Sequence, residues 1–204
     1  MLKLYYSPNS CSLASHIALE ISGADYEVIK LNFAEAEQTK SGYLSLNPKG
    51  RVPALVTEQG VLTENPAILM YIAMSFPDSA LIPKDDIFAL SKIQSFNAYL
   101  SSTVHVAHAH GHRGYRWSDD EAAIKSMSLK MSQNVGDCFE LIESELLEGP
   151  WVLGERFSCA DIYLFTISQW LEADKVDISR FPKVHNLRET MRKLPAVQLV
   201  LSNQ

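Results

Sequence analysis

Cys11 is the residue best placed for chemistry, because it lies at the predicted start of a helix, directly after a short strand and a turn. At a helix N-terminus, backbone N–H groups and the helix dipole stabilise negative charge. An ordinary thiol has a pKa of about 8.5, and such a position lowers it to roughly 3.5 to 7.5. We therefore expect a thiolate at Cys11 or on a bound thiol. The alternative is a small residue that packs beside the turn.

Val52 and Pro53 are the second candidate, because X-Pro bonds are where cis peptides occur and this proline opens a predicted strand. If the bond is cis, the Val52 backbone turns outward and pairs with an extended peptide ligand as an added strand would. Taken alone, the dipeptide is better explained as a trans proline at a strand edge.

Glu64 and Asn65 precede Pro66, which favours a helix start with Asn65 as its N-cap. The exposed N–H groups of such a start bind a carboxylate, and Glu64 beside them is suited to an amino group. A γ-glutamyl group carries both. By itself, however, this motif is an ordinary capped helix.

A run of histidines follows in the second half of the chain. His105 and His108 share one helical face, as do His108 and His112, which is a spacing that metal sites use. No acidic or cysteine partner lies nearby in sequence, so we expect no metal, and we expect Gly111 to fray the helix. The histidines are expected to line a substrate pocket between two domains, together with Tyr115.

Hydrophobic periodicity predicts the elements that position these residues. Strands are predicted at residues 2–6, 26–33, 52–57 and 61–63, and helices at 11–22 and 67–76. After a segment with two prolines, helical periodicity runs through residues 87–109, 119–147, 160–172 and 184–194. We therefore predict an α/β domain over residues 1–77, a linker over 78–87 and an all-helical domain over 88–204.

Composition excludes several classes of protein. A formal charge of -6 argues against nucleic-acid binding, which needs clustered cations. No apolar run approaches the roughly 18 to 20 residues of a membrane helix, and the start lacks a signal-peptide pattern, so a cytoplasmic protein is expected. The three cysteines are odd in number and far apart, which argues against a disulfide framework.

Four motifs together resemble one family from end to end, the cytosolic glutathione S-transferases, and most closely the bacterial beta class. They are Ser7-Pro8-Asn9-Ser10-Cys11-Ser12-Leu13-Ala14, Asn47-Pro48-Lys49-Gly50-Arg51-Val52-Pro53-Ala54-Leu55, Leu62-Thr63-Glu64-Asn65-Pro66-Ala67-Ile68 and Phe157-Ser158-Cys159-Ala160-Asp161. The resemblance implies an α+β protein: a thioredoxin-like N-terminal domain (βαβαββα) with a cis Pro53, followed by an all-α domain. Ser158 and Asp161 fit a structural capping box.

The resemblance also implies a division of roles. Cys11 and His105 would be catalytic, and Val52 would pair with the cysteinyl backbone of glutathione. The glutathione-binding set is Cys11, Arg51, Val52, Pro53, Glu64, Asn65, Ser102 and His105. The second-substrate pocket is Tyr6, His108, His112 and Tyr115. Because other classes activate the thiol with Tyr or Ser, the alternatives are Tyr5, Tyr6 and Ser10.

Three positions depart from the family pattern. Asn65 stands where the family usually has Ser, and Ala98 stands where the beta class has an Asn, with Asn97 one position away. A loop lysine of the beta class has no aligned partner, although Lys40 lies in that region.

The expected activity is conjugation of glutathione to electrophilic hydrophobic substrates in detoxification, with thiol-disulfide exchange through Cys11 as a second activity. The alternatives are a non-catalytic binding module with this fold and a glutathione-dependent reductase, dehalogenase or isomerase. The expected partners are glutathione, a small electrophile and a second copy of the chain, with no metal, nucleic acid or membrane.

Overall fold

The computed structural model describes residues 1–203, which form two compact units. Unit 1 comprises Met1–Leu90 and Arg192–Gln204, and unit 2 comprises Ser91–Met191. The chain's C-terminal end thus groups with unit 1, whereas the sequence places it in the second domain. The expected boundaries at 77 and 88 stay a prediction. Among the described residues, no helix combines the length and apolar character needed to cross a membrane.

Unit 1 is built on a mixed sheet in the order β2-β1-β3-β4. The strands are β1 (Leu2–Tyr6), β2 (Tyr26–Lys30), β3 (Ala54–Thr57) and β4 (Gly60–Thr63). β1 and β2 are parallel because a helix connects them, and β3 and β4 form an antiparallel hairpin. The predicted second strand ends at Lys30 instead of residue 33, because 3-10 turns begin at Phe33.

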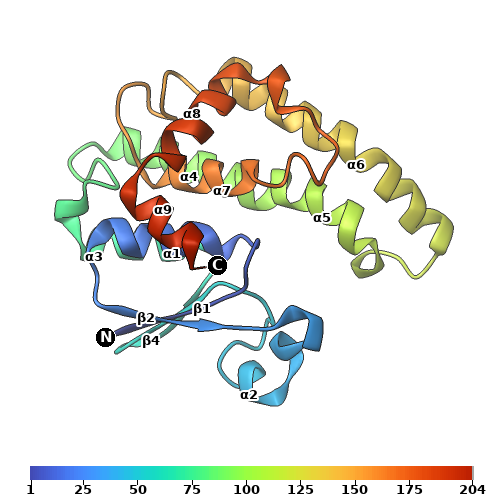
Figure 1. Cartoon of the computed structure of the whole chain (residues 1–204), viewed down its shortest axis with the longest axis horizontal. Coiled ribbons are helices and arrows are strands. Elements are labelled where there is room, and N and C mark those ends of the chain that lie inside the picture. The colour runs from blue at the N-terminus through green and yellow to red at the C-terminus, as the bar shows by residue number, and fades with distance from the viewer. Residues whose placement is uncertain (204) are drawn as a thin grey trace. The chain divides into compact units, whose positions relative to one another are not determined.

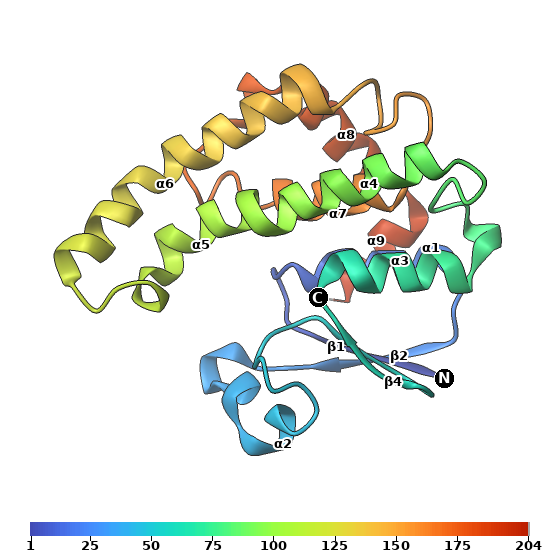
Figure 2. The same cartoon turned by 180° about the vertical axis from the view of Figure 1, so that it is seen from behind.

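The helices of unit 1 are α1 (Ser12–Ser22), α2 (Ser41–Leu44), α3 (Asn65–Ser75) and α9 (Pro195–Ser202). α1 and α3 cover one face of the sheet, and α2 lies on the opposite side (Figures 1 and 2). α1 contacts both α3 and α9. Its apolar residues Ile17 and Leu19 are fully buried, and it ends at Gly23, whose positive φ of 68° suits glycine.

Unit 2 is helical within the part of the chain that the structure describes. Its elements are α4 (Ile87–Tyr99, which begins in unit 1), the π-helical turn η4 (Leu100–Val104), α5 (His105–Arg113), α6 (Glu121–Leu141), the π-helical turn η6 (Ile142–Leu146), α7 (Cys159–Ser168) and α8 (Pro182–Arg192, which ends in unit 1). The predicted helix 87–109 therefore continues to Arg113 through a π-helical turn, and the predicted helix 160–172 ends at Ser168.

Gly111 does not fray α5, so that expectation is wrong. The helix continues to Arg113 and runs beside α6 (Figures 1 and 2). A Cβ at Gly111 would lie 1.8 Å from Sδ of Met131, which is a severe overlap. Glycine is used here because the two helices approach closely, not because the helix ends.

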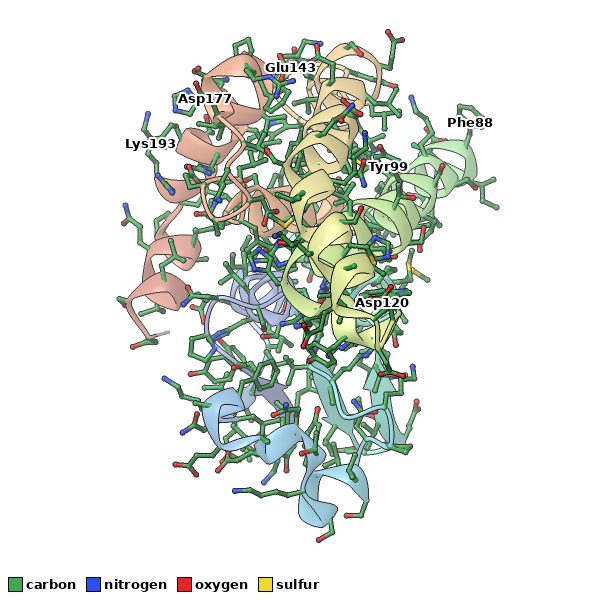
Figure 3. The ribbon with its side chains drawn as sticks, turned by 90° about the vertical axis from the view of Figure 1, so that its right-hand side faces the viewer. Phe88, Tyr99, Asp120, Glu143, Asp177 and Lys193 are labelled. Atoms are coloured by element: carbon green, nitrogen blue, oxygen red, sulfur yellow. The ribbon has the colours of Figure 1, made fainter. Side chains whose placement is uncertain are left out.

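The capping box at the start of α7 is confirmed. The Ser158 side chain accepts from the Ala160 N–H, and the Asp161 carboxylate accepts from the backbone N–H groups of Ser158 and Val152, each at 2.7 Å. All residues of α7 are buried, which makes it the core helix of unit 2. At the start of α8, the Glu143 carboxylate, labelled in Figure 3, accepts from the Lys183 N–H at 2.9 Å.

Candidate active site

Cys11 occupies the N-cap position of α1, as the sequence predicts. Its side chain is partly exposed, and Sγ lies 3.4 Å from the carbonyl oxygen of Val52. Its own carbonyl accepts a 2.7 Å hydrogen bond from Nδ2 of Asn65. The structure therefore brings three motifs together in unit 1, although 41 and 54 residues separate Cys11 from Val52 and Asn65.

The Val52-Pro53 peptide bond is cis, which confirms the prediction from family resemblance. The segment before it is held in place from α2 and the following loop. The carbonyl of Arg51 accepts from the Tyr43 hydroxyl at 2.6 Å and from Nδ2 of Asn47 at 2.7 Å. Burial raises the pKa of Tyr43, so this phenol stays a donor at neutral pH. The Val52 backbone is thereby fixed next to the thiol.

Glu64, not Asn65, occupies the N-cap of α3, so the predicted capping residue is corrected. Glu64 has φ 72° and ψ 122°, a conformation that residues with a Cβ rarely adopt. Such strain costs about 1–3 kcal/mol and is typical of functional sites. Nζ of Lys49 donates to Oε1 of Glu64 at 2.7 Å and to Oγ1 of Thr63 at 2.8 Å, leaving a half-exposed carboxylate beside the helix start.

Asn65 is the first residue of α3, and its side chain is buried. Its Oδ1 accepts from the Ser15 hydroxyl at 2.6 Å, while Nδ2 donates to Cys11. The amide thus links α3 to α1 instead of capping its own helix. The sequence gives no sign of this, because Asn before Pro is an ordinary capping signal.

The alternative thiol activators Tyr5, Tyr6 and Ser10 each make contacts within unit 1. Oγ of Ser10 lies 2.6 Å from Oγ of Ser12 and 2.8 Å from the Ser7 carbonyl, which braces the turn before α1. Tyr6 is only 4% exposed, and its hydroxyl donates to the Asn203 carbonyl at 3.3 Å. The ring of Tyr5 packs against that of Tyr43. The place of Tyr6 in a substrate pocket stays a prediction, which this burial does not favour.

The remaining predicted residues lie in unit 2. His105 begins α5, with its ring centroid 4.9 Å from that of Trp170. Ser102 lies on η4 and donates to the Ala98 carbonyl at 2.8 Å, and Tyr115 is largely exposed after α5. Asn97 is fully buried, with Nδ2 3.9 Å from Sγ of Cys159. The roles of His105, Ser102 and Tyr115 stay predictions.

Sequence reasoning missed Asp174. Its carboxylate lies 2.8 Å from Nδ1 of His108 and 3.0 Å from Nε2 of His112. The sequence suggests no acidic partner for these histidines, because Asp174 is 66 residues beyond His108. Only tertiary packing places it there.

Comparisons with known proteins show what this chain is similar to. Residues 1–74 match the family model of the glutathione S-transferase N-terminal domain, and residues 105–195 match that of the C-terminal domain. Glutathione S-transferase GstA of Escherichia coli O157:H7 is 32% identical over 98% of each chain. A crystal structure of a glutathione transferase homologue from Sulfitobacter with bound glutathione is 42% identical, with TM-score 0.97, and covers 100% of this chain and 98% of that one. A beta-class glutathione S-transferase of Sphingomonas chungbukensis is 35% identical, with TM-score 0.86, over 98% of each chain.

Proposed function

Since this chain belongs to the glutathione S-transferase family and is a glutathione transferase, we propose that glutathione lies in unit 1 against Cys11, Val52 and Glu64. The observation that carries this proposal is the convergence of a helix-start thiol, the cis Val52-Pro53 bond beside it and a carboxylate at a second helix start. Each group matches one part of the tripeptide.

The backbone of Val52 pairs with the cysteinyl residue of glutathione as an added strand would. The γ-glutamyl carboxylate lies at the N-terminus of α3, where N–H groups favour an anion, and the amino group pairs with Glu64. Arg51, Pro53, Asn65, Ser102 and His105 complete the proposed glutathione contacts.

The glutathione sulfur then lies beside the start of α1, where the helix dipole favours the thiolate. In conjugation, the thiol loses its proton to solvent and the thiolate attacks an electrophilic carbon. A sulfur–carbon bond forms, and the leaving group departs with its electron pair. The step needs no metal. His105 would donate a hydrogen bond to the sulfur, and Tyr6, His108, His112 and Tyr115 would contact the electrophile.

A second activity follows from Cys11 itself. Its thiolate attacks the glutathione sulfur of a disulfide between glutathione and another thiol, forms a mixed disulfide with glutathione and releases the other compound as its thiolate. A second glutathione thiolate then attacks the mixed disulfide, which restores Cys11 and releases oxidised glutathione. A transferase with Ser or Tyr at this position has no such route.

Crystals grown with glutathione, together with turnover of an aromatic halide and a mixed disulfide, test the assignment. We expect the sulfur beside Cys11, loss of disulfide exchange in Cys11→Ala and a roughly tenfold slower conjugation in His105→Ala. A sulfur bound far from Cys11, or unchanged rates in both variants, would reject it.

We further propose membership of the beta class, a cytoplasmic role in detoxification and a homodimer. The Cys11 motif and the similarity to a beta-class structure support the first of these. Sedimentation that shows only monomer at micromolar concentration would reject the dimer.

A further inference from the structure

His108, His112 and Asp174 form a compact cluster within unit 2 that takes no part in the proposed activation of the thiol. Nδ1 of His108 lies 2.8 and 2.9 Å from the two carboxylate oxygens of Asp174, and Nε2 of His112 lies 3.0 Å from Oδ1. One donor atom from each residue lies within 4.8 Å of the others. The two histidines are four positions apart on α5, so both rings project from the same face.

The cluster is closed on its inner side and open on its outer side. The side chain of Asp174 is 2% exposed, that of His108 is 13% exposed and that of His112 is 42% exposed. The ring of Trp170 stacks on His108, with centroids 4.3 Å apart and planes inclined by 25°. Packing therefore holds the side chains of Asp174 and His108 in place. The side chain of His112 borders solvent, which leaves an entry path to the cluster.

The backbone around Asp174 is also fixed. Its N–H donates to the Trp170 carbonyl at 2.9 Å, and the Val176 N–H donates to the Leu171 carbonyl at 2.9 Å. From α6, the Ser132 hydroxyl donates to the Lys175 carbonyl at 3.0 Å. The carboxylate is thus presented by a turn that is anchored at both ends.

The charge of this carboxylate needs a partner. A buried carboxylate is costly unless it is paired or bound to a metal. Within residues 1–203, the ion pairs of Asp174 are those with His108 and His112. A bound dication would supply such a partner.

We propose that Nδ1 of His108, Nε2 of His112 and the Asp174 carboxylate bind a divalent transition-metal ion of the Zn²⁺ type. Two imidazoles and one carboxylate suit Zn²⁺ or Co²⁺, whereas Mg²⁺ and Ca²⁺ prefer oxygen ligands. Tetrahedral bonds of about 2.0–2.1 Å separate ligand atoms by about 3.3 Å. The donor atoms here lie within 4.8 Å of one another, so the two imidazole side chains would adjust their positions as the ion binds. A fourth position remains for water on the solvent side of His112.

The test uses the untagged full chain after chelator treatment, with Co²⁺ and Zn²⁺ as probes. We expect one Co²⁺ per chain with the intense visible absorption of a tetrahedral ion, its displacement by Zn²⁺, and a rise in Tm with Zn²⁺. His112→Ala should weaken Zn²⁺ binding at least tenfold, because it removes one of the three proposed ligands. The variant should still fold, because the exposed ring of His112 contributes little to stability.

His110→Ala is the matched control. His110 lies on the same helix, but its ring packs on Trp117 at 4.3 Å, so binding should be unchanged. Asp174→Asn separates a three-ligand site from a simple histidine pair and should lose the Co²⁺ absorption. Absence of that absorption in the wild type, or equal Zn²⁺ affinity in wild type and His112→Ala, would overturn the proposal. If Asp174→Asn does not fold, His112→Ala decides alone.

Discussion

The side-chain amide of Asn65 donates a 2.7 Å hydrogen bond to the backbone carbonyl of Cys11 and so joins the starts of α3 and α1. Its Oδ1 accepts from Ser15 in the buried space between the two helices. The proposed binding groups for the two ends of the glutathione γ-glutamylcysteine unit are therefore mechanically connected.

Asn65→Ala should lower the free energy of unfolding by about 1–3 kcal/mol, because it leaves Ser15 and the Cys11 carbonyl without their buried partner. It should also weaken glutathione binding, since the start of α1 is released. Ser15→Ala should lower stability but largely keep glutathione affinity, because it leaves the bond to Cys11. Denaturant unfolding and calorimetric titration measure both, and equal affinity losses in the two variants would contradict this account.

Cys11→Ala should abolish the mixed disulfide that forms with oxidised glutathione, as read by intact-protein mass spectrometry. Cys138→Ser should leave it unchanged, because burial raises the pKa of the Cys138 thiol and keeps it protonated. Adduct formation that persists in Cys11→Ala would place the reactive sulfur elsewhere.

Glu64→Gln should raise the KM for glutathione roughly tenfold or more. A hydrogen bond to a charged group contributes about 1.5–3 kcal/mol, and 1.4 kcal/mol corresponds to a factor of ten. Glu58→Gln is the control, because that carboxylate is 92% exposed in the turn between β3 and β4. Steady-state kinetics at fixed electrophile concentration measure the effect, and an identical KM in both variants would remove Glu64 from the site.

Asp161→Ala should destabilise the protein by about 2–4 kcal/mol, because it leaves the buried N–H groups of Val152 and Ser158 without an acceptor. Asp120, labelled in Figure 3, caps α6 through a 2.9 Å bond from the Ala122 N–H in an exposed position. Asp120→Ala should cost only about 1 kcal/mol. Thermal and denaturant unfolding compare the two, and equal costs would show that burial does not strengthen the α7 cap.

His16 should make unit 1 sensitive to acid. Burial lowers the pKa of His16 to about 4 from 6.5, and its ring lies between those of Tyr6 and Tyr26. The unfolded chain then binds the proton more readily, so stability falls as the pH drops from 6.5 towards 4, by up to about 3 kcal/mol. His16→Phe should flatten this pH dependence, whereas His185→Gln, at an exposed site, should not. A wild-type slope retained in His16→Phe would exclude His16 as the cause.

Local sequence signals were enough to predict the main elements that position the candidate site. Cys11 follows a strand and a turn, Pro66 marks a helix start, and Ser158 with Asp161 forms a capping box. Such signals depend on hydrogen bonds between residues a few positions apart, so residue type and spacing determine them. The cis bond at Pro53 followed from resemblance to a family, not from spacing.

The tertiary structure decided the partners that lie far apart in the chain. Asn65, which the sequence predicts as a helix cap, instead donates a hydrogen bond to Cys11. Asp174 contacts His108 and His112, although more than sixty residues separate it from each of them. α9 grouped with unit 1 because it packs on α1. These contacts depend on how helices pack against one another, and the local order of residues does not specify that packing.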